Sequence, residues 1–284
     1  MTRDARRRIV DGAARTGVYL MAALALIPLA LVLLFTIQKG WPAVSHVEFF
    51  IHSYRPQFVG GAGVEHAIVG SLMMVAMASL LAIPLGVIGG IHLAEYSGTR
   101  WAAWVRLSAD VLVGTPSIAI GLLAYSLIVL TIGHFSALAG AIALAVLMLP
   151  VVMRTTEGAL SLVPHAMRES ALALGMPRWR VSVQVMLLAG LPGVITGALL
   201  AVSRAAGETA PLLFTTFGSQ RLNLDPTQPM MALPLIIYKY ALTPYQWEVD
   251  QAWGAALVLV ILALGLNLGS RVALRRQTRM IGRV

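Results

Sequence analysis

Two opposite charges stand in one of the most apolar regions of the chain. Arg204 and Glu208 lie within SRAAGETAP (residues 203–211), with GVITGALLAV before it and LLFTTFG after it. Residues four apart share one face of a helix. A guanidinium offers a planar fork of donors that fits an oxyanion, and a neighbouring carboxylate can orient that fork. The pair therefore predicts either an anion-binding site or a purely structural ion pair.

The composition of the chain indicates that the pair lies in a membrane. Of its 284 residues, 58% are hydrophobic and only 12% are charged. A helix needs about 20 apolar residues to cross a hydrocarbon core about 30 Å thick. Six segments approach this length, so the sequence predicts an all-α, polytopic membrane protein with six transmembrane helices. The predicted spans are residues 17–37, 67–94, 107–130, 136–153, 187–213 and 252–270.

The distribution of Lys and Arg predicts the orientation. With a cytoplasmic N-terminus, sixteen of the 21 basic residues fall in cytoplasmic segments, four in external segments and one, Arg204, within a span. This positive-inside bias predicts that both termini are cytoplasmic, and it accounts for the net charge of +9 without nucleic acid. The predicted organisation has four parts: a cytoplasmic basic N-terminus (1–16), the first transmembrane helix with an external loop (17–64), the main transmembrane domain with a cytoplasmic loop at 154–186 (65–272), and a cytoplasmic basic tail (273–284).

The segment around Arg204 is too long for one straight helix. Between Arg180 and Arg221 only Arg204 and Glu208 are charged. A straight helix of this length measures about 60 Å, twice the hydrocarbon core. The chain must therefore bend or leave the membrane, for which it offers Pro192, Gly193, Gly207 and Pro211. An arginine at mid-depth costs about 2.5–3.5 kcal/mol on insertion scales, so Arg204 must face a partner or water.

Other polar residues near predicted spans are weaker candidates. Thr115 and Ser117 flank Pro116, where the helix is expected to open, and Thr209 follows Glu208. Their hydroxyls either line a path or bond back to their own helix. Asp110 is expected to pair with a cytoplasmic arginine.

The long cytoplasmic loop contains a short predicted helix. Pro164 suits its start, and Gly175 followed by proline suits its end. The sequence ESALALG (169–175) resembles the cytoplasmic loop signature of ABC-type importer permeases, with Ser in place of the first Ala of Glu-Ala-Ala. That resemblance implies that the helix docks on a separate ATPase subunit, with Glu169, Ala171 and Gly175 at the coupling site.

Four further stretches resemble the permeases of ABC-type phosphate importers: SRAAGETAPLLFT (203–215), LAEY (93–96), DVLVGTPSIAIGLLAYSLIV (110–129) and PMMALPLIIYKYA (229–241). The resemblance covers roughly residues 65–272. It implies the type I ABC importer permease fold and a transmembrane subunit of an ATP-driven phosphate importer. It also implies three partners: a second permease subunit, a dimer of ATPase subunits and an external phosphate-binding protein. Residues 229–241 then either cap the path on the external side or simply pack there.

Several kinds of chemistry are not indicated by the sequence. There is no Gly-Lys pair for a P-loop, so ATP and Mg²⁺ are expected on the partner ATPase and no cofactor on this chain. There is no cysteine, and the histidines lack metal-ligand spacing, so no metal site is predicted. Two alternatives stay open. One is a permease for another oxyanion, such as molybdate, sulfate or phosphonate; the other is an intramembrane enzyme using Glu208 or Asp110 as a base.

Overall fold

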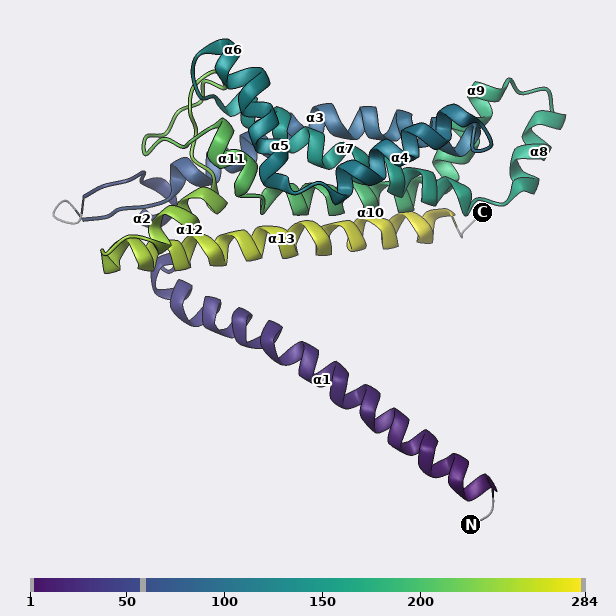
Figure 1. Ribbon diagram of the computed structural model, residues 1–284, viewed down its shortest axis with the longest axis horizontal. Coiled ribbons are helices and arrows are strands. Elements are labelled where there is room, and N and C mark those ends of the chain that lie inside the picture. Colours follow the sequence, from purple (N-terminus) through teal and green to yellow (C-terminus); the bar gives the residue numbers. More distant parts are fainter. Residues whose placement is uncertain (1–2, 57–59, 282–284) are drawn as a thin grey trace.

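The computed structural model describes residues 3–56 and 60–281. Within these ranges the chain is helical and contains no strand (Figure 1). Five helical segments are long and apolar enough to cross a membrane. They are α1 (Arg3–Val44), α3 (Glu65–Glu95), α7 (Ala137–Ser161), Arg178–Ala206, which contains α10 (Leu187–Ala206), and α13 (Gln246–Ile281). A bent pair supplies a sixth candidate. The extreme ends of the predicted basic termini, residues 1–2 and 282–284, lie outside the described residues.

Helix α7 lies at the centre of the bundle. In its most apolar stretch 67% of the residues are buried, against 6% in α1. Its principal partner is α3, whose glycines bring the two backbones together. A methyl group added at Gly86 would lie 2.7 Å from Cβ of Val152, and one at Gly90 would lie 2.5 Å from Cβ of Thr156. Small residues at such contacts are typical of helix packing in membranes.

The bent pair replaces the straight third span that the sequence predicts at 107–130. The chain turns by 102° between α4 (Arg100–Gly114) and the segment Ser117–Ile132. That segment comprises α5 (Ser117–Ala124), the π-helical η1 (Tyr125–Val129) and α6 (Leu130–Ile132). Pro116 disfavours helical geometry at the residue before it, and Thr115 is accordingly extended. Proline also has no backbone N–H to donate to a helical hydrogen bond. The predicted opening at Pro116 is confirmed, as a sharp turn.

The fifth predicted span breaks at only one of its candidate positions. Helix α9 (Arg178–Arg180), the π-helical η2 (Val181–Met186) and α10 follow one another without interruption. The helix passes through Pro192, because packing on α7 supports it where proline removes one backbone hydrogen bond. It ends at Ala206, and after Gly207 the chain enters α11 (Ala210–Thr215).

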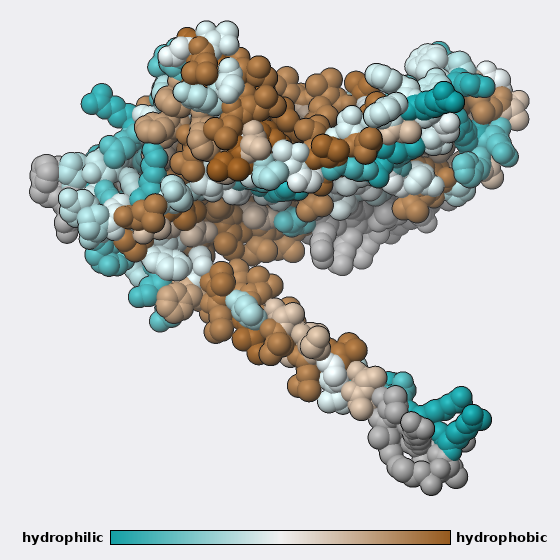
Figure 2. Space-filling view, in the orientation of Figure 1, coloured by the Kyte–Doolittle hydropathy of each residue, from teal (hydrophilic) through white to brown (hydrophobic). Residues whose placement is uncertain are grey.

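Helix α1 leaves the bundle as a single helix. Figure 1 shows its N-terminal end far from the other helices, and its main contact is with α13. That contact lies near its C-terminal end, where the rings of Phe35 and Trp253 are 5.9 Å apart. Most apolar side chains of α1 are exposed, as the brown surface in Figure 2 shows. Such a surface faces lipid or another chain.

The two ends of the bundle carry the short helices. The α8 end holds α8 (His165–Ala173) and α9, and hydrophilic residues gather there in Figure 2. The α12 end holds α2 (Glu48–Ile51), α11 and α12 (Leu233–Ala241). Within the predicted loop at 154–186, residues 154–161 continue α7 and residues 178–186 belong to the next helix. The short helix predicted between Pro164 and Gly175 is α8.

Residues 229–241 fold back into the α12 end. Met230 to Ile236 are all buried, and their hydrophobic side chains are at most 2% exposed apart from Pro234, which is also buried. The hydroxyl of Thr216 donates to the carbonyl of Met230 at 2.7 Å, and the Ser71 hydroxyl accepts from the Leu233 amide at 2.7 Å. This segment is therefore part of the packed bundle.

Candidate functional site

Arg204 and Glu208 stand on the two sides of a helix end. Arg204 lies in the last turn of α10, and its carbonyl accepts the amide of Gly207 at 3.1 Å. The Glu208 amide bonds the carbonyl of Ala205 at 3.2 Å, after which Thr209 leads into α11. The four-residue spacing thus brings the two side chains together around a tightened helix terminus, and not along a continuous helix.

The ion pair is loose and leaves the guanidinium accessible. Nε of Arg204 lies 3.5 Å from Oε1 of Glu208. Among the described residues, the guanidinium of Arg204 donates no hydrogen bond to a group other than Glu208. Its side chain is 47% exposed, whereas that of Glu208 is 16% exposed. The carboxylate is therefore largely covered by this chain, and about half of the arginine side chain stays accessible.

The pair lies at the surface between α7 and the end of α10. A shallow cleft there is lined by Leu147, Met148 and Val151 of α7 and by Ala201, Arg204, Ala205 and Glu208. The cleft has no enclosed room for even a water molecule. An anion bound to Arg204 would consequently need a second surface to enclose it and exclude water.

The other predicted path residues do not join this cleft. Thr115 and Ser117 flank the turn between α4 and α5, and the Thr115 hydroxyl donates to the Val111 carbonyl at 2.7 Å. Of the two alternatives that the sequence left open for Thr115, the structure shows the one in which the hydroxyl bonds to its own helix. Thr209 caps α11 without a side-chain hydrogen bond to the helix amides. Helix α5 packs on α11, so the turn and the break in the chain belong to one packed region.

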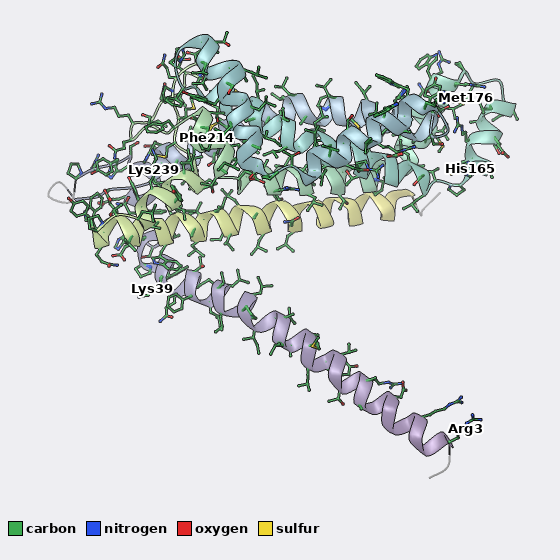
Figure 3. The ribbon with its side chains drawn as sticks, in the orientation of Figure 1. Arg3, Lys39, His165, Met176, Phe214 and Lys239 are labelled. Atoms are coloured by element: carbon green, nitrogen blue, oxygen red, sulfur yellow. The ribbon has the colours of Figure 1, made fainter. Side chains whose placement is uncertain are left out.

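Helix α8 ends in a turn that requires glycine. The Gly175 amide bonds the Leu172 carbonyl at 2.9 Å and the Met176 amide bonds the Ala171 carbonyl at 3.2 Å, which together form a Schellman motif. Gly175 has φ of +82°, a conformation that costs residues with a Cβ about 1–2 kcal/mol. His165 and Met176, labelled in Figure 3, mark the start of α8 and the turn after it.

The predicted coupling residues lie on different faces of α8. Glu169 is exposed, whereas Ala171 is buried and attaches the helix to the rest of the chain. Large apolar side chains nearby are open to solvent, among them Leu162 at 85%, Leu174 at 84% and Trp179 at 62% exposure. Exposed apolar side chains beside charged ones are typical of a protein contact surface.

A cluster that the sequence analysis missed connects α8 to the bundle. One carboxylate oxygen of Glu95, the last residue of α3, accepts a short hydrogen bond from Nη2 of Arg168 in α8. The other oxygen accepts from the hydroxyl of Ser182 at 3.1 Å. The only sequence signal was the position of Glu95 within LAEY, because its partners lie 73 and 87 residues further along the chain.

A second charged network joins α4 to α7. Arg106 Nε donates to Glu157 at 2.5 Å, and Arg154 donates to the same carboxylate at 2.6 Å. Arg154 Nε also lies 3.1 Å from Asp110. The expectation that Asp110 pairs with an arginine is confirmed.

At the α12 end, Lys239 is held by a strained turn. Its Nζ donates to the Phe217 carbonyl at 2.6 Å and lies 4.6 Å from the centre of the Phe217 ring. Phe217 has φ of +56° and stacks on Phe135. Burial lowers the pKa of Lys239. These contacts tie Lys239, labelled in Figure 3, to the loop after α11.

Sequence comparisons relate the chain to transport proteins. A family model described as "Binding-protein-dependent transport system inner membrane component" matches residues 82–282. The phosphate transport system permease protein PstA of Yersinia pestis is 42% identical over 85% of this chain and 82% of its own length. PstA 1 of Mycobacterium tuberculosis is 40% identical over 96% of this chain and 92% of its own length in one strain.

Solved structures show the same fold. A chain of a bacterial alginate ABC transporter, solved in complex with an alginate-bound periplasmic protein, matches with a TM-score of 0.66 at 14% identity and covers 97% of both chains. A chain of the MetNI methionine ABC transporter matches with a TM-score of 0.60 at 18% identity, over 75% of this chain and 94% of its own. The broken membrane helices, the helix α8 and the sequence matches agree, and the chain belongs to the family of inner membrane components of binding-protein-dependent transport systems.

Proposed function

We propose that the chain is a transmembrane permease subunit of an ATP-driven importer of inorganic phosphate. The observation that carries this proposal is the 40–44% identity to phosphate transport system permeases over most of the chain. Phosphate also suits the chemistry of the site, since a half-exposed arginine fork at membrane depth fits a tetrahedral oxyanion.

Within this function, Arg204 contacts the anion during its passage. Glu208 orients the guanidinium and opposes the anion's charge, which keeps the contact weak enough for release. The separation of 3.5 Å between Nε of Arg204 and Oε1 of Glu208 supports these two roles. A closer ion pair would occupy the N–H donors that the anion needs. Thr115, Ser117 and Thr209 are secondary candidates at the neighbouring turns of the chain.

The chain works with other subunits. The incomplete cleft at Arg204 requires a second permease to close the path. Because the sequence contains no Gly-Lys pair, ATP and Mg²⁺ bind a separate pair of ATPase subunits, and this chain carries no cofactor or metal. An external phosphate-binding protein delivers the anion. Glu169 and Gly175 belong to the surface that α8 offers to the ATPase, and Ala171 anchors that helix from its buried side.

The orientation follows from the distribution of basic residues. Both termini and α8 face the cytoplasm, and the α12 end faces the outside of the inner or plasma membrane. Reporter fusions after residues 60 and 225 are expected to read as external, and a fusion after residue 170 as internal. An external reading at 170 would contradict both the orientation and the contact of α8 with an ATPase.

Transport by the assembled complex tests the substrate. We expect vesicles containing all subunits to take up radiolabelled phosphate when ATP is supplied, and to prefer it to molybdate, sulfate and phosphonate. Arginine recognises anionic charge more than identity, so this comparison is needed to separate phosphate from the other oxyanions. Uptake of another oxyanion in place of phosphate would assign the permease to that anion. Chemical conversion of the anion would instead favour an intramembrane enzyme.

A further inference from the structure

The Glu95 cluster joins three elements at the α8 end. Glu95 ends α3, Arg168 lies in the middle of α8, and Ser182 lies in η2 at the start of the fifth membrane segment. One carboxylate oxygen accepts from Arg168, and the other lies 3.1 Å from the Ser182 hydroxyl, which is shared with the Arg178 carbonyl at 3.0 Å. The Glu95 side chain is 13% exposed and that of Arg168 is 26% exposed. The cluster is therefore a partly buried ion pair with an additional hydrogen bond.

Among the described residues, few contacts connect α8 to α3. The only extensive backbone packing of α8 is with η2, and Ala171 is its one buried residue among the described side chains. The hydrogen bond from Arg168 to Glu95 consequently forms the direct link between α8 and α3. Without it, α8 would stay attached to the bundle through η2 and through residues 162–164, which join it to α7.

Helix α3 extends this link across the bundle. At one end it carries Glu95, and near the other its Ser71 hydroxyl accepts the amide of Leu233 in α12. Between them, Gly86 and Gly90 let α3 pack closely against the central helix α7. Close-packed interiors transmit strain. A displacement of α8 applied through Glu95 would therefore act on a helix that reaches the opposite end of the molecule.

We propose that Glu95 is a positioning residue for energy coupling, which transmits the movement of α8 to α3 through Arg168 and to the fifth membrane segment through Ser182. This role rests on the proposed docking of α8 on an ATPase. It gives Glu95 no contact with phosphate or ATP. Loss of the link would let the ATPase move α8 and η2 without moving α3 in step.

The test compares single and paired charge variants in vesicles containing all subunits. For Glu95→Gln and Arg168→Gln, we expect the phosphate transported per ATP hydrolysed to fall by at least about fivefold. The exchange Glu95→Arg with Arg168→Glu should restore a large part of that ratio. It is sterically feasible because the pair borders a cavity of about 210 Å³. Asp110→Asn is the matched control, since it breaks a more exposed ion pair that does not touch α8.

The outcomes separate this proposal from the proposed function. If the unaltered complex does not transport phosphate, the function itself is wrong. If it does, and the single variants keep its ratio of transport to hydrolysis, the positioning role is wrong. The exchanged variant could also assemble without regaining the normal amount of phosphate transported per ATP hydrolysed. That result would contradict the positioning role, because it would show that the ion pair serves assembly and not coupling. Failure of the exchanged variant to assemble would equally overturn the proposal.

A distance measurement provides a second readout. Because the chain has no cysteine, Ser170→Cys in α8 and Ile88→Cys in α3 can carry a pair of spin labels in the assembled complex. We expect the distance between the labels to stay the same with and without ATP, and to change with ATP once Glu95→Gln is added. Equal behaviour of the Glu95→Gln and Asp110→Asn variants would argue against the link.

Discussion

Arg204→Met combined with Glu208→Gln is expected to insert and assemble but to lose phosphate uptake by at least about 100-fold. Hydrogen bonds to charged groups contribute about 1.5–3 kcal/mol each, so loss of a two-pronged contact removes at least about two powers of ten in binding. If the pair were only a structural brace, the uncharged variant would transport normally, because it leaves no charge unpaired in the membrane.

Single variants divide the roles within the pair. Arg204→Lys should transport poorly, since an ammonium lacks the planar fork of a guanidinium. Glu208→Gln should alter uptake without preventing assembly, because it removes the opposing charge and keeps the shape of the side chain. Arg221→Met serves as the control for loss of a positive charge, as Arg221 is exposed in the loop after α11. Uptake and substrate-stimulated ATP hydrolysis are measured in vesicles, with assembly checked by co-purification. Near-normal uptake by the double variant would refute the anion contact.

Features that depend on neighbouring residues were predictable from the sequence. Pro164 and Gly175 bound a helix that the structure shows as α8, because proline and glycine act on the backbone locally. Pro116 opens the chain where expected for the same reason. The charge spacing at 204 and 208 predicted an ion pair, which exists at 3.5 Å. The number of apolar segments gave the membrane fold, since span length is set by the thickness of the bilayer.

Features that depend on distant segments were not predictable. Glu95 and Arg168 meet only because α3 and α8 end at the same side of the bundle. Pro192 could have ended its helix, but α10 continues through it where it packs on α7. The sequence left open whether residues 229–241 cap the path or simply pack, and only the hydrogen bonds to Ser71 and Thr216 show how closely they pack. In each case tertiary contacts overrode or completed a local preference.

The turn after α8 gives the second large expected effect. Gly175→Val should insert and assemble but reduce ATP-driven phosphate uptake by about tenfold or more. Space does not oppose the new side chain, since no atom lies within 4 Å of a methyl group added there. The effect comes from the backbone, because φ of +82° is strongly disfavoured for a β-branched residue. Relief of that strain would break the hydrogen bonds of Gly175 and Met176 and misdirect the exposed end of α8.

A series at this position distinguishes backbone strain from other causes. Gly175→Asn should retain most uptake, because asparagine tolerates the left-handed conformation, and Gly175→Ala should fall between the asparagine and valine variants. Gly158→Val is a matched control at an exposed helical glycine with equally open surroundings. Uptake and ATP hydrolysis are measured together in vesicles with all subunits. If Gly175→Val keeps the normal ratio of transport to hydrolysis, α8 does not need this turn to receive the movement of the ATPase, and its docking role would have to be abandoned.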